Sequence, residues 1–485
     1  MNPKPSLITL HNTLSRSIEE FKPIKSGVVT MYHCGPTVYW TQHIGNLRGM
    51  TMGDLVVRTL RYFGYQVTHV RNYTDVGHLT SDSDTGEDKM EKGAKREGLD
   101  PKQIADKYIA QFERDTKALN LLEPTHKPRA TEYIQQMIQL AQELMDKGFA
   151  YATDLAVYFD VQKFPSYTQL SGQNLKQLIS GAGSADVMDP AKRSPLDFAL
   201  WFFKAGVHAK ALQTWPSPFS SPLVKNGQGF PGWHIECSAM SRSLLGETID
   251  IHMGGIEHIP VHHTNEIAQS EAASGKKFVD YWLHNEHLVV NNEKMAKSQG
   301  TGFSLQEITD KGYDPLALRY FFLGAHYRSK QNFTWEALDA AKNGLTEFRK
   351  RYAELKQNGK RIEATSKQAL TLKGKFENAL ASDFNLPQAL AIAWETVKSN
   401  IAPGEKYSLL KEFDTVLGLD LDAYEGDGEK VENAPASVQT LLEKREAARK
   451  AKQFQESDAL RREIESLGYM IEDAATGPKL RRKSR

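Results

Sequence analysis

The feature of the sequence that most restricts its fold is a strand, a turn, a helix and a second strand that follow one another near the N-terminus. Val28–Tyr32 is a short apolar run rich in β-branched residues, which is typical of a buried strand. A turn at residues 34–36 leads to His43–Asn46, after which apolar side chains recur at helical spacing up to Gly64. Val67–Arg71 has the pattern of a second strand. This order predicts a βαβ unit, and therefore a parallel sheet with helices on its faces.

The same α/β pattern stops and later resumes. A helical stretch from Asp100 to Lys147 is followed, up to about Pro222, by short strand-like pieces that alternate with turns. Beyond Gly232 a strand-like ETIDIHM, a helical NEIAQSEAASG and a strand-like EHLVV restore the earlier pattern. We expect a Rossmann-type parallel sheet that is split by an inserted module.

The C-terminal third is predicted to be almost wholly helical. Long helical segments follow one another after Asp314, which is typical of a bundle. Residues 426–437 (GDGEKVENAPAS) are polar and contain glycine and proline, so they are interpreted as a linker. A basic helix is expected over residues 438–468, and the last nine residues carry five positive charges.

Composition limits the cellular setting. The chain has 485 residues, which is too long for a single core. Its 61 Lys+Arg nearly balance its 60 Asp+Glu, so the net charge is close to zero. Two cysteines cannot build a disulfide framework, which favours a reducing compartment. The N-terminus has no apolar signal-peptide core, and no apolar run is long enough to cross a bilayer. We expect a cytoplasmic protein with no membrane partner.

Two separate segments suit the binding of phosphate. A helix N-terminus attracts anions, and in HIGN the glycine Gly45 lets a nucleotide approach the backbone while His43 and Asn46 can donate hydrogen bonds. Lys294 and Lys297, in KMAKS, fit a loop that neutralises the charge that builds up during phosphate chemistry. Each segment alone is also compatible with an ordinary solvated turn or loop. Together, in one interrupted α/β sheet, they favour a nucleotide site.

Both cysteines belong to a candidate metal site. Cys237 lies in PGWHIECS, and downstream His262 and Glu266 are four residues apart on a predicted helix, and so share one face. With Cys34, these thiols, imidazole and carboxylate suit a tetrahedral Zn²⁺ ion. The alternative is that the cysteines are buried, unreactive and small, as free cysteines often are. Sequence spacing does not decide between the two.

Several motifs taken together resemble a known family. The segments are CGPTVY, HIGN, PGWHIECSAM, HHTNEIAQSEA, KMAKS and ALRYFFLGAHYRS, in that order along the chain. They resemble those of class I cysteinyl-tRNA synthetases, and the similarity runs from about Ile8 nearly to the C-terminus. PGWHIECSAM and HHTNEIAQSEA are the most specific of the set.

The resemblance implies a role for each motif residue. The family's zinc ligands fall on Cys34, Cys237, His262 and Glu266. The family's HIGH motif falls on His43–Asn46, in which Gly45 would contact ATP. The family's KMSKS loop falls on Lys294–Ser298, in which Lys297 would also contact ATP. The residues that line the family's amino-acid pocket fall on Thr74 and Trp233.

The resemblance also implies the reaction. L-cysteine would be activated with Mg²⁺·ATP to cysteinyl-adenylate and pyrophosphate, and the cysteinyl group would pass to the 3′ end of tRNA(Cys). A hydrophobic pocket separates cysteine from serine poorly, whereas zinc prefers a thiolate, so the metal would select the substrate. A monomer is implied as well.

The implied architecture has six parts. They are residues 1–130, the first half of the catalytic domain; 131–221, the inserted module; 222–290, the second half; 291–330, the KMSKS-loop and stem-contact region; 331–425, the helical bundle; and 426–485, a small anticodon-binding domain with a basic tail.

The sequence departs from the family pattern at four places. HIGH ends in Asn46, which carries no charge, and KMSKS has become KMAKS at Ala296. The segment after Asp75 differs from the family's usual run, so no role is carried over for residues 76–91. Residues 260–261 replace the usual Phe-Pro, so His263 is an alternative ligand to the first histidine of the pair.

Two other functions stay open at this point. A cysteine ligase of the mycothiol pathway shares the catalytic core and the zinc, but lacks a C-terminal anticodon module, which this chain keeps. A non-catalytic RNA-binding paralogue would retain the fold alone, and Asn46 and Ala296 lend it slight support.

Overall fold

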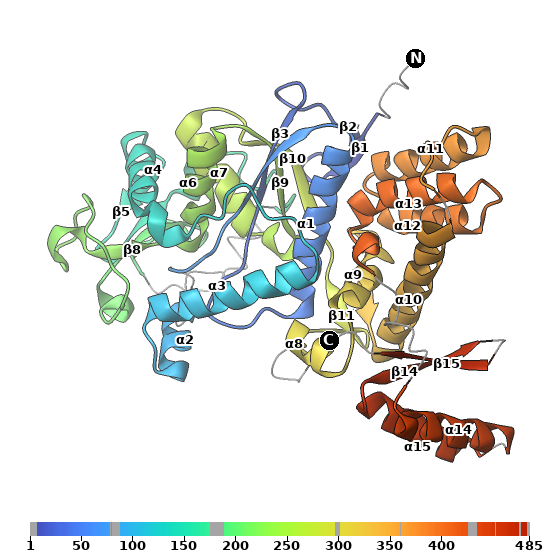
Figure 1. Ribbon diagram of the computed structural model, residues 1–485. Helices are drawn as coiled ribbons and strands as arrows, with labels where there is room; N and C mark the ends of the chain where they lie inside the picture. Colours follow the sequence, from blue (N-terminus) through green and yellow to red (C-terminus); the bar gives the residue numbers. More distant parts are fainter. Residues whose placement is uncertain are drawn as a thin grey trace.

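The structure is a computed structural model (Figure 1). It describes residues 7–77, 79, 88–174, 189–295, 301–358, 360–424, 434–451, 453–474 and 477–482. Among the sequence predictions, Ala296, Lys297, most of the atypical segment 76–91 and most of the expected linker lie outside the described residues.

A parallel four-stranded sheet with the order β10-β9-β3-β4 lies at the centre of the N-terminal part. Its strands are β3 (Val28–His33), β4 (Gln66–Arg71), β9 (Ile249–Gly255) and β10 (Val279–Asn285). Because all neighbouring pairs are parallel, their carboxyl ends meet at one edge. The Rossmann-type sheet expected from the sequence is confirmed.

The predicted βαβ unit is formed by β3, α1 (Ile44–Tyr62) and β4. His43 is the N-cap of α1, so the helix begins inside the HIGN segment. The chain turns away at Gly64, whose φ of +88° belongs to a conformation that L-residues avoid. Between these ends almost every residue from Leu47 to Leu60 is buried, which makes α1 a central helix of the fold.

A second, antiparallel sheet interrupts the first between β4 and β9, as the split pattern predicted. It has the order β5-β6-β7-β8 and packs with α4 and α6. The elements of this half are β1 (Thr9–Asn12), β2 (Ser17–Glu20), α2 (Lys89–Glu97), α3 (Pro101–Ala118), α4 (Ile134–Asp146), β5 (Ala150–Ala152), β6 (Ala156–Phe159), β7 (Phe198–Phe203), β8 (Gly229–Pro231), α6 (Trp233–Leu245) and α7 (His262–Ser274).

One expectation about the resumed sheet was wrong. EHLVV contributes β11 (Leu288–Val290), which pairs with β12 (Glu293–Lys294) and β13 (Gln331–Phe333) in a separate small sheet. The last strand of the central sheet is instead β10, which the sequence pattern missed. Its polar residues obscured the apolar run, although the strand is almost fully buried.

The next helices after β12 are yellow to orange in Figure 1, and some of them pack against α1. They are α8 (Leu305–Asp310), α9 (Pro315–Leu323), α10 (Trp335–Asn358), α11 (Lys367–Ala381), α12 (Leu386–Lys398) and α13 (Pro403–Leu417). The helical bundle predicted from the sequence is therefore present.

Buried charges join α1 to this bundle. Arg319 of α9 and Arg58 of α1 both bind the Asp54 carboxylate, at 2.7 and 2.9 Å. Arg319 Nε also donates to the Leu417 carbonyl at 2.7 Å, and Arg58 Nη1 to the Thr415 carbonyl at 3.0 Å. Each of the three charges is thus paired, as burial requires.

The C-terminal part contains more elements than the single basic helix that was expected. It contains two antiparallel helices and a hairpin: α14 (Ala436–Lys450), α15 (Phe454–Ser466), β14 (Tyr469–Ala474) and β15 (Gly477–Arg482). Side chains of both helices and of the hairpin form a small hydrophobic cluster in this part. In the described part of the chain, no helix is both long and apolar enough to cross a membrane.

Candidate active site and metal centre

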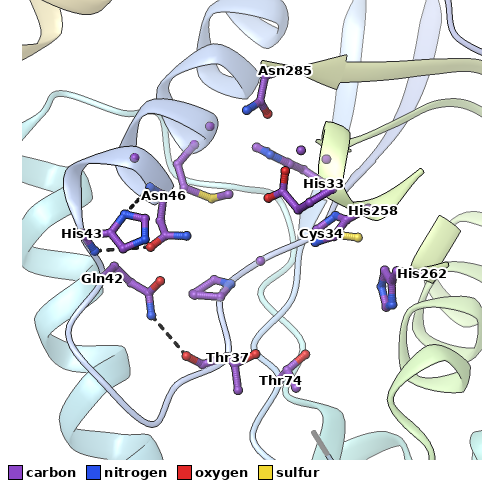
Figure 2. A pocket seen from close by; sticks show the side chains of 18 of the residues that line it. His33, Cys34, Thr37, Gln42, His43, Asn46, Thr74, His258, His262 and Asn285 are labelled. Carbon is purple, nitrogen blue, oxygen red and sulfur yellow. Dashed lines mark hydrogen bonds between the residues drawn. The ribbon is translucent and has the colours of Figure 1, made fainter. Parts of the chain in front are cut away.

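A cavity of about 500 Å³ opens at the carboxyl ends of β3 and β9 (Figure 2). This edge is where open parallel sheets bind ligands. Its lining includes nine of the residues singled out from the sequence or their direct neighbours: Cys34, Gly35, His43, Gly45, Asn46, Thr74, Trp233, Cys237 and His262. Glu266, the remaining member of the metal set, is fully buried behind this wall. The fold therefore gathers residues that lie up to 232 positions apart along the chain.

The N-terminus of α1 forms one end of the cavity. The Asn46 backbone N–H donates to His43 Nδ1 at 3.2 Å, and the His43 backbone N–H donates to Asn46 Oδ1 at 3.3 Å. This reciprocal capping box, drawn in Figure 2, fixes both side chains at the positive end of the helix dipole. Gln42, the preceding residue, donates to the Thr37 carbonyl at 3.1 Å and so holds the loop that leads to the helix.

Described residues before and after Lys297 lie at the same helix end. The Ile44 N–H donates to the Phe303 carbonyl at 2.8 Å, just beyond the segment. On the near side, Met295 Cε lies 3.2 Å from the position that a Cβ on Gly45 would occupy. Lys294 is a residue of β12. Met295 and Phe303, which come before and after Lys297 in the chain, therefore both lie at the start of α1.

The candidate metal group lies at the opposite side of the cavity. Cys34 follows β3, Cys237 lies in the first turns of α6, and His262 and Glu266 share one face of α7. Cys34 Sγ lies 4.0 Å from Cys237 Sγ and 3.9 Å from Glu266 Oε1, and His262 Nε2 lies 3.0 Å from the same oxygen. One donor atom from each of the four residues lies within 4.8 Å of the others, and all four are buried.

These distances fit a zinc ion. Two thiolates at the usual zinc–sulfur distance of about 2.3 Å in a tetrahedron lie about 3.8 Å apart. The 4.0 Å between the two sulfurs is close to that value. His262 Nδ1 lies 3.0 Å from His234 Nδ1, a contact of the kind that turns the opposite ring nitrogen toward a metal.

His262 and its alternative, His263, belong to two different possible donor groups. A second possible donor group contains Cys34, His252, His263 and Glu266. Of these two groups, which come from the described residues, the one with His262 includes both cysteines. The ring of His263 is oriented by His284, whose Nε2 lies 2.7 Å from His263 Nδ1. His263 Nε2 also lies 3.4 Å from Cys34 Sγ, so His263 stays an alternative ligand.

The charges of the group also suit a divalent cation. The hydrogen bond with Cys34 lowers the pKa of Cys237 to about 6, whereas burial raises the pKa of Cys34 well above its usual value. Burial opposes ionisation of Glu266, yet His252 and His262 hold the pKa of its carboxyl far below normal. Although burial acts in the other direction, Glu266 and Cys237 raise the pKa of His262 to about 10. A metal would replace the protons on His262 and Cys34.

Trp233 and Thr74 face the cavity next to the metal group. The Trp233 ring stacks on the His262 ring, with 4.2 Å between centroids and 25° between planes. Thr74 Oγ1 accepts from Asn72 Nδ2 at 3.3 Å, and Asn72 Oδ1 accepts from the Gly35 N–H at 2.8 Å. A Cβ on Gly35 would lie 1.7 Å from the Asn72 carbonyl, so only glycine allows this approach.

Comparison with known proteins bears on the identity of this site. The family model described as tRNA synthetases class I (C) catalytic domain matches residues 20–343, and the cysteinyl-tRNA ligase anticodon binding domain matches residues 432–479. A cysteine–tRNA ligase from Treponema denticola is 42% identical over 96% of this chain and 98% of its own. The chain belongs to the cysteine–tRNA ligase family. A second family member, cysteine–tRNA ligase 1 from Burkholderia lata, is 44% identical over 98% of this chain and 96% of its own.

Solved structures agree on the fold. Methionyl-tRNA synthetase from Mycobacterium tuberculosis aligns with a TM-score of 0.53 at 14% identity, over 81% of this chain and 90% of that one. A leucyl-tRNA synthetase from Agrobacterium radiobacter aligns with a TM-score of 0.59 at 13% identity, over 83% and 85%. The cysteine–tRNA ligase family thus shares its architecture with other class I synthetases.

Sequence reasoning missed some residues of the cavity. Asn285 ends β10, the strand that was not predicted; His287 follows it, and Glu257 follows β9. Lys89 lies in the atypical segment from which no role was carried over. A correct assignment of β10 would have placed Asn285 at the active edge, because that edge collects the carboxyl ends of all four strands.

Proposed function

We propose that this chain joins L-cysteine to the 3′ end of tRNA(Cys) at the expense of ATP. The observation that carries the proposal is the placement of a buried Cys-Cys-His-Glu group and the N-terminus of α1 on the same cavity. One side suits a thiol and the other a nucleotide. In the first step the cysteine carboxylate attacks the α-phosphate and releases pyrophosphate, and in the second the cysteinyl group passes to a ribose hydroxyl of the tRNA.

In this proposal Cys34, Cys237, His262 and Glu266 hold one zinc ion. Bound zinc would take the substrate's thiolate and reject the harder hydroxyl of serine. Thr74 and Trp233 form the rest of the amino-acid pocket. The stacking of Trp233 on His262 supports this, because it closes the cavity directly beside the metal group.

The nucleotide is proposed to bind at the start of α1, with Mg²⁺ accompanying ATP. Gly45 allows close approach of the backbone, and His43 and Asn46 contact phosphate oxygens from the positive end of the helix dipole. Lys294 and Lys297 add positive charge as the transition state forms, with Lys297 also in contact with ATP. These groups position and stabilise charge, and none needs to bond covalently to the substrate.

The remaining parts of the proposal concern the whole chain. Residues 1–130 and 222–290 form the catalytic domain, 131–221 the inserted module, and 291–330 the stem-contact region. Residues 331–425 form the bundle, and 426–485 bind the anticodon. The protein is proposed to act as a cytoplasmic monomer.

Asn46→Asp is expected to raise the KM for ATP at least about tenfold, with little change in Tm. Aspartate keeps the acceptor that Asn46 offers to the His43 N–H, so the capping box persists. It also brings a negative charge to the place proposed for a phosphate. Steady-state ATP–pyrophosphate exchange measures the KM, and Asn46→Ala serves as the neutral control. An unchanged KM for ATP would contradict the phosphate contact.

The function itself is tested by amino-acid-dependent ATP–pyrophosphate exchange with zinc-loaded protein, followed by aminoacylation of tRNA(Cys). Exchange that depends on cysteine and not on serine, together with charging of tRNA(Cys), is expected. Exchange without tRNA charging, but with transfer to an amino sugar, would favour the mycothiol-pathway ligase. Absence of exchange in metal-replete protein would favour a non-catalytic RNA-binding paralogue. The match of residues 432–479 to an anticodon-binding domain weighs against the first of these rivals.

A further inference from the structure

Lys89 brings a positive charge to the cavity from a segment to which the family motifs assign no role. It lies in the first turn of α2, and its side chain is half-buried at the cavity wall. Asp88 caps this helix by accepting from the Glu91 N–H at 2.9 Å, which fixes where Lys89 leaves the backbone. Among the described residues that line the cavity, Lys89 is the only lysine or arginine.

The position of Lys89 is unfavourable for the helix. A cation in the first turn faces the positive end of the helix dipole and costs stability, and aspartate or glutamate is the usual choice there. The helix itself therefore gains nothing from this charge. Asn46 strengthens the argument, because the uncharged amide leaves the start of α1 without the cation that a histidine could carry.

Packing places the ammonium group next to the amino-acid pocket. Lys89 Nζ lies 5.9 Å from the centroid of the Trp233 ring, and that ring stacks on His262. The His262 imidazole, the Trp233 indole and the Lys89 ammonium group therefore follow one another along the cavity wall. A cysteine whose sulfur is held at the metal group has its carboxylate only three bonds away, which is within the reach of a flexible lysine side chain on the same wall.

We propose that Lys89 is a substrate-binding residue that pairs with the α-carboxylate of cysteine. The proposal rests on the function proposed above and identifies a recognition element for the same site. The pair would hold the carboxylate at the cavity wall before activation, and it would let the site distinguish an amino acid from a thiol-amine that lacks a carboxylate. A charge-assisted contact in a partly buried site is strong enough to be measured as a separate contribution to affinity.

The test compares two ligands on zinc-loaded protein by titration calorimetry. L-cysteine carries the carboxylate, and L-cysteinol has the same thiol and amine but an alcohol in its place. Lys89→Met is expected to raise the Kd for cysteine at least about tenfold and to change the Kd for cysteinol less than about twofold. Lys89→Arg is expected to retain most of the affinity for cysteine, because it keeps the charge.

Lys92→Met is the matched control, since Lys92 lies on the same helix and is exposed. It should bind both ligands as the unchanged protein does. Equal weakening of both ligands by Lys89→Met would show that Lys89 only supports Trp233 and would overturn the proposal, as would unchanged affinity for cysteine. Wild-type protein that fails to catalyse cysteine-dependent exchange would overturn the proposed function and this inference together. If wild-type protein is active and Lys89→Met binds cysteine with unchanged affinity, the inference alone is overturned.

Discussion

Cys237→Ser is expected to lower bound zinc well below one ion per chain and to reduce kcat/KM for cysteine in ATP–pyrophosphate exchange about 10³-fold. Serine offers a hydroxyl that stays protonated and is a poor zinc ligand, whereas Cys237 already has a pKa of about 6 because of the hydrogen bond with Cys34. The loss corresponds to about 4 kcal/mol of transition-state stabilisation. Preference for cysteine over serine should fall as bound zinc is lost, because the remaining pocket separates the two substrates by shape alone.

Metal analysis of the purified variants and exchange assays with each amino acid measure both effects. Ser243→Ala is the control, because Ser243 also lies in α6 and its hydroxyl donates only within the helix, to the Ala239 carbonyl at 2.7 Å. It should keep full zinc and full selectivity. If Cys237→Ser retained zinc and discriminated against serine as well as the unchanged protein does, the metal site proposed here would be wrong.

Deletion of residues 426–485 is expected to reduce kcat/KM for charging of tRNA(Cys) about 10³-fold while leaving cysteine-dependent exchange within about threefold. The removed part contains the segment that matches an anticodon-binding domain. It also has its own hydrophobic cluster, formed by Ala434, Val438, Ile464, Tyr469, Ile471 and Leu480. Since these side chains pack on one another, their removal exposes little of the core that supports the catalytic cavity.

The truncated chain should therefore keep its Tm and its bound zinc, and both are measured before activity is compared. Charging assayed over a range of tRNA concentrations shows whether the loss lies in affinity. A truncated protein that charged tRNA(Cys) as well as the full chain would contradict the role of residues 426–485. Loss of exchange together with charging would show instead that the catalytic part depends on the removed segment.

The first half of the fold was readable from the sequence because its elements are local and regular. Val28–Tyr32, the helix after His43 and Val67–Arg71 each occupy one continuous stretch with a single periodicity. β10 was missed because His284 and Asn285 break its apolar pattern, although both are buried. His284 is paired within the fold, with Nδ1 2.8 Å from Thr13 Oγ1 and Nε2 2.7 Å from His263.

The candidate site was predictable as a set of residue types but not as a geometry. Cys34 and Cys237 are separated by 203 positions, so their sulfurs meet only because β3 and α6 lie side by side in the folded chain. The sequence also could not show how His262 and His263 are placed, since adjacent residues of a helix point about 100° apart; in the structure, His262 groups with both cysteines and His263 with Cys34 and His252. Lys89 was overlooked because the motif around it is unusual.

The buried charges of α1 have a mechanical consequence. A helix of 19 residues is about 28 Å long. His43 stands at its cavity end, whereas Arg58 and the Arg319 that pairs with Asp54 donate to the Thr415 and Leu417 carbonyls at the end of α13. Any tilt of the bundle has to move Asp54 with it. Separating Asp54 from Arg319 would leave a buried charge unpaired, which costs about 3–5 kcal/mol. Through these buried ion pairs, the bundle and the end of the cavity at His43 move as one body.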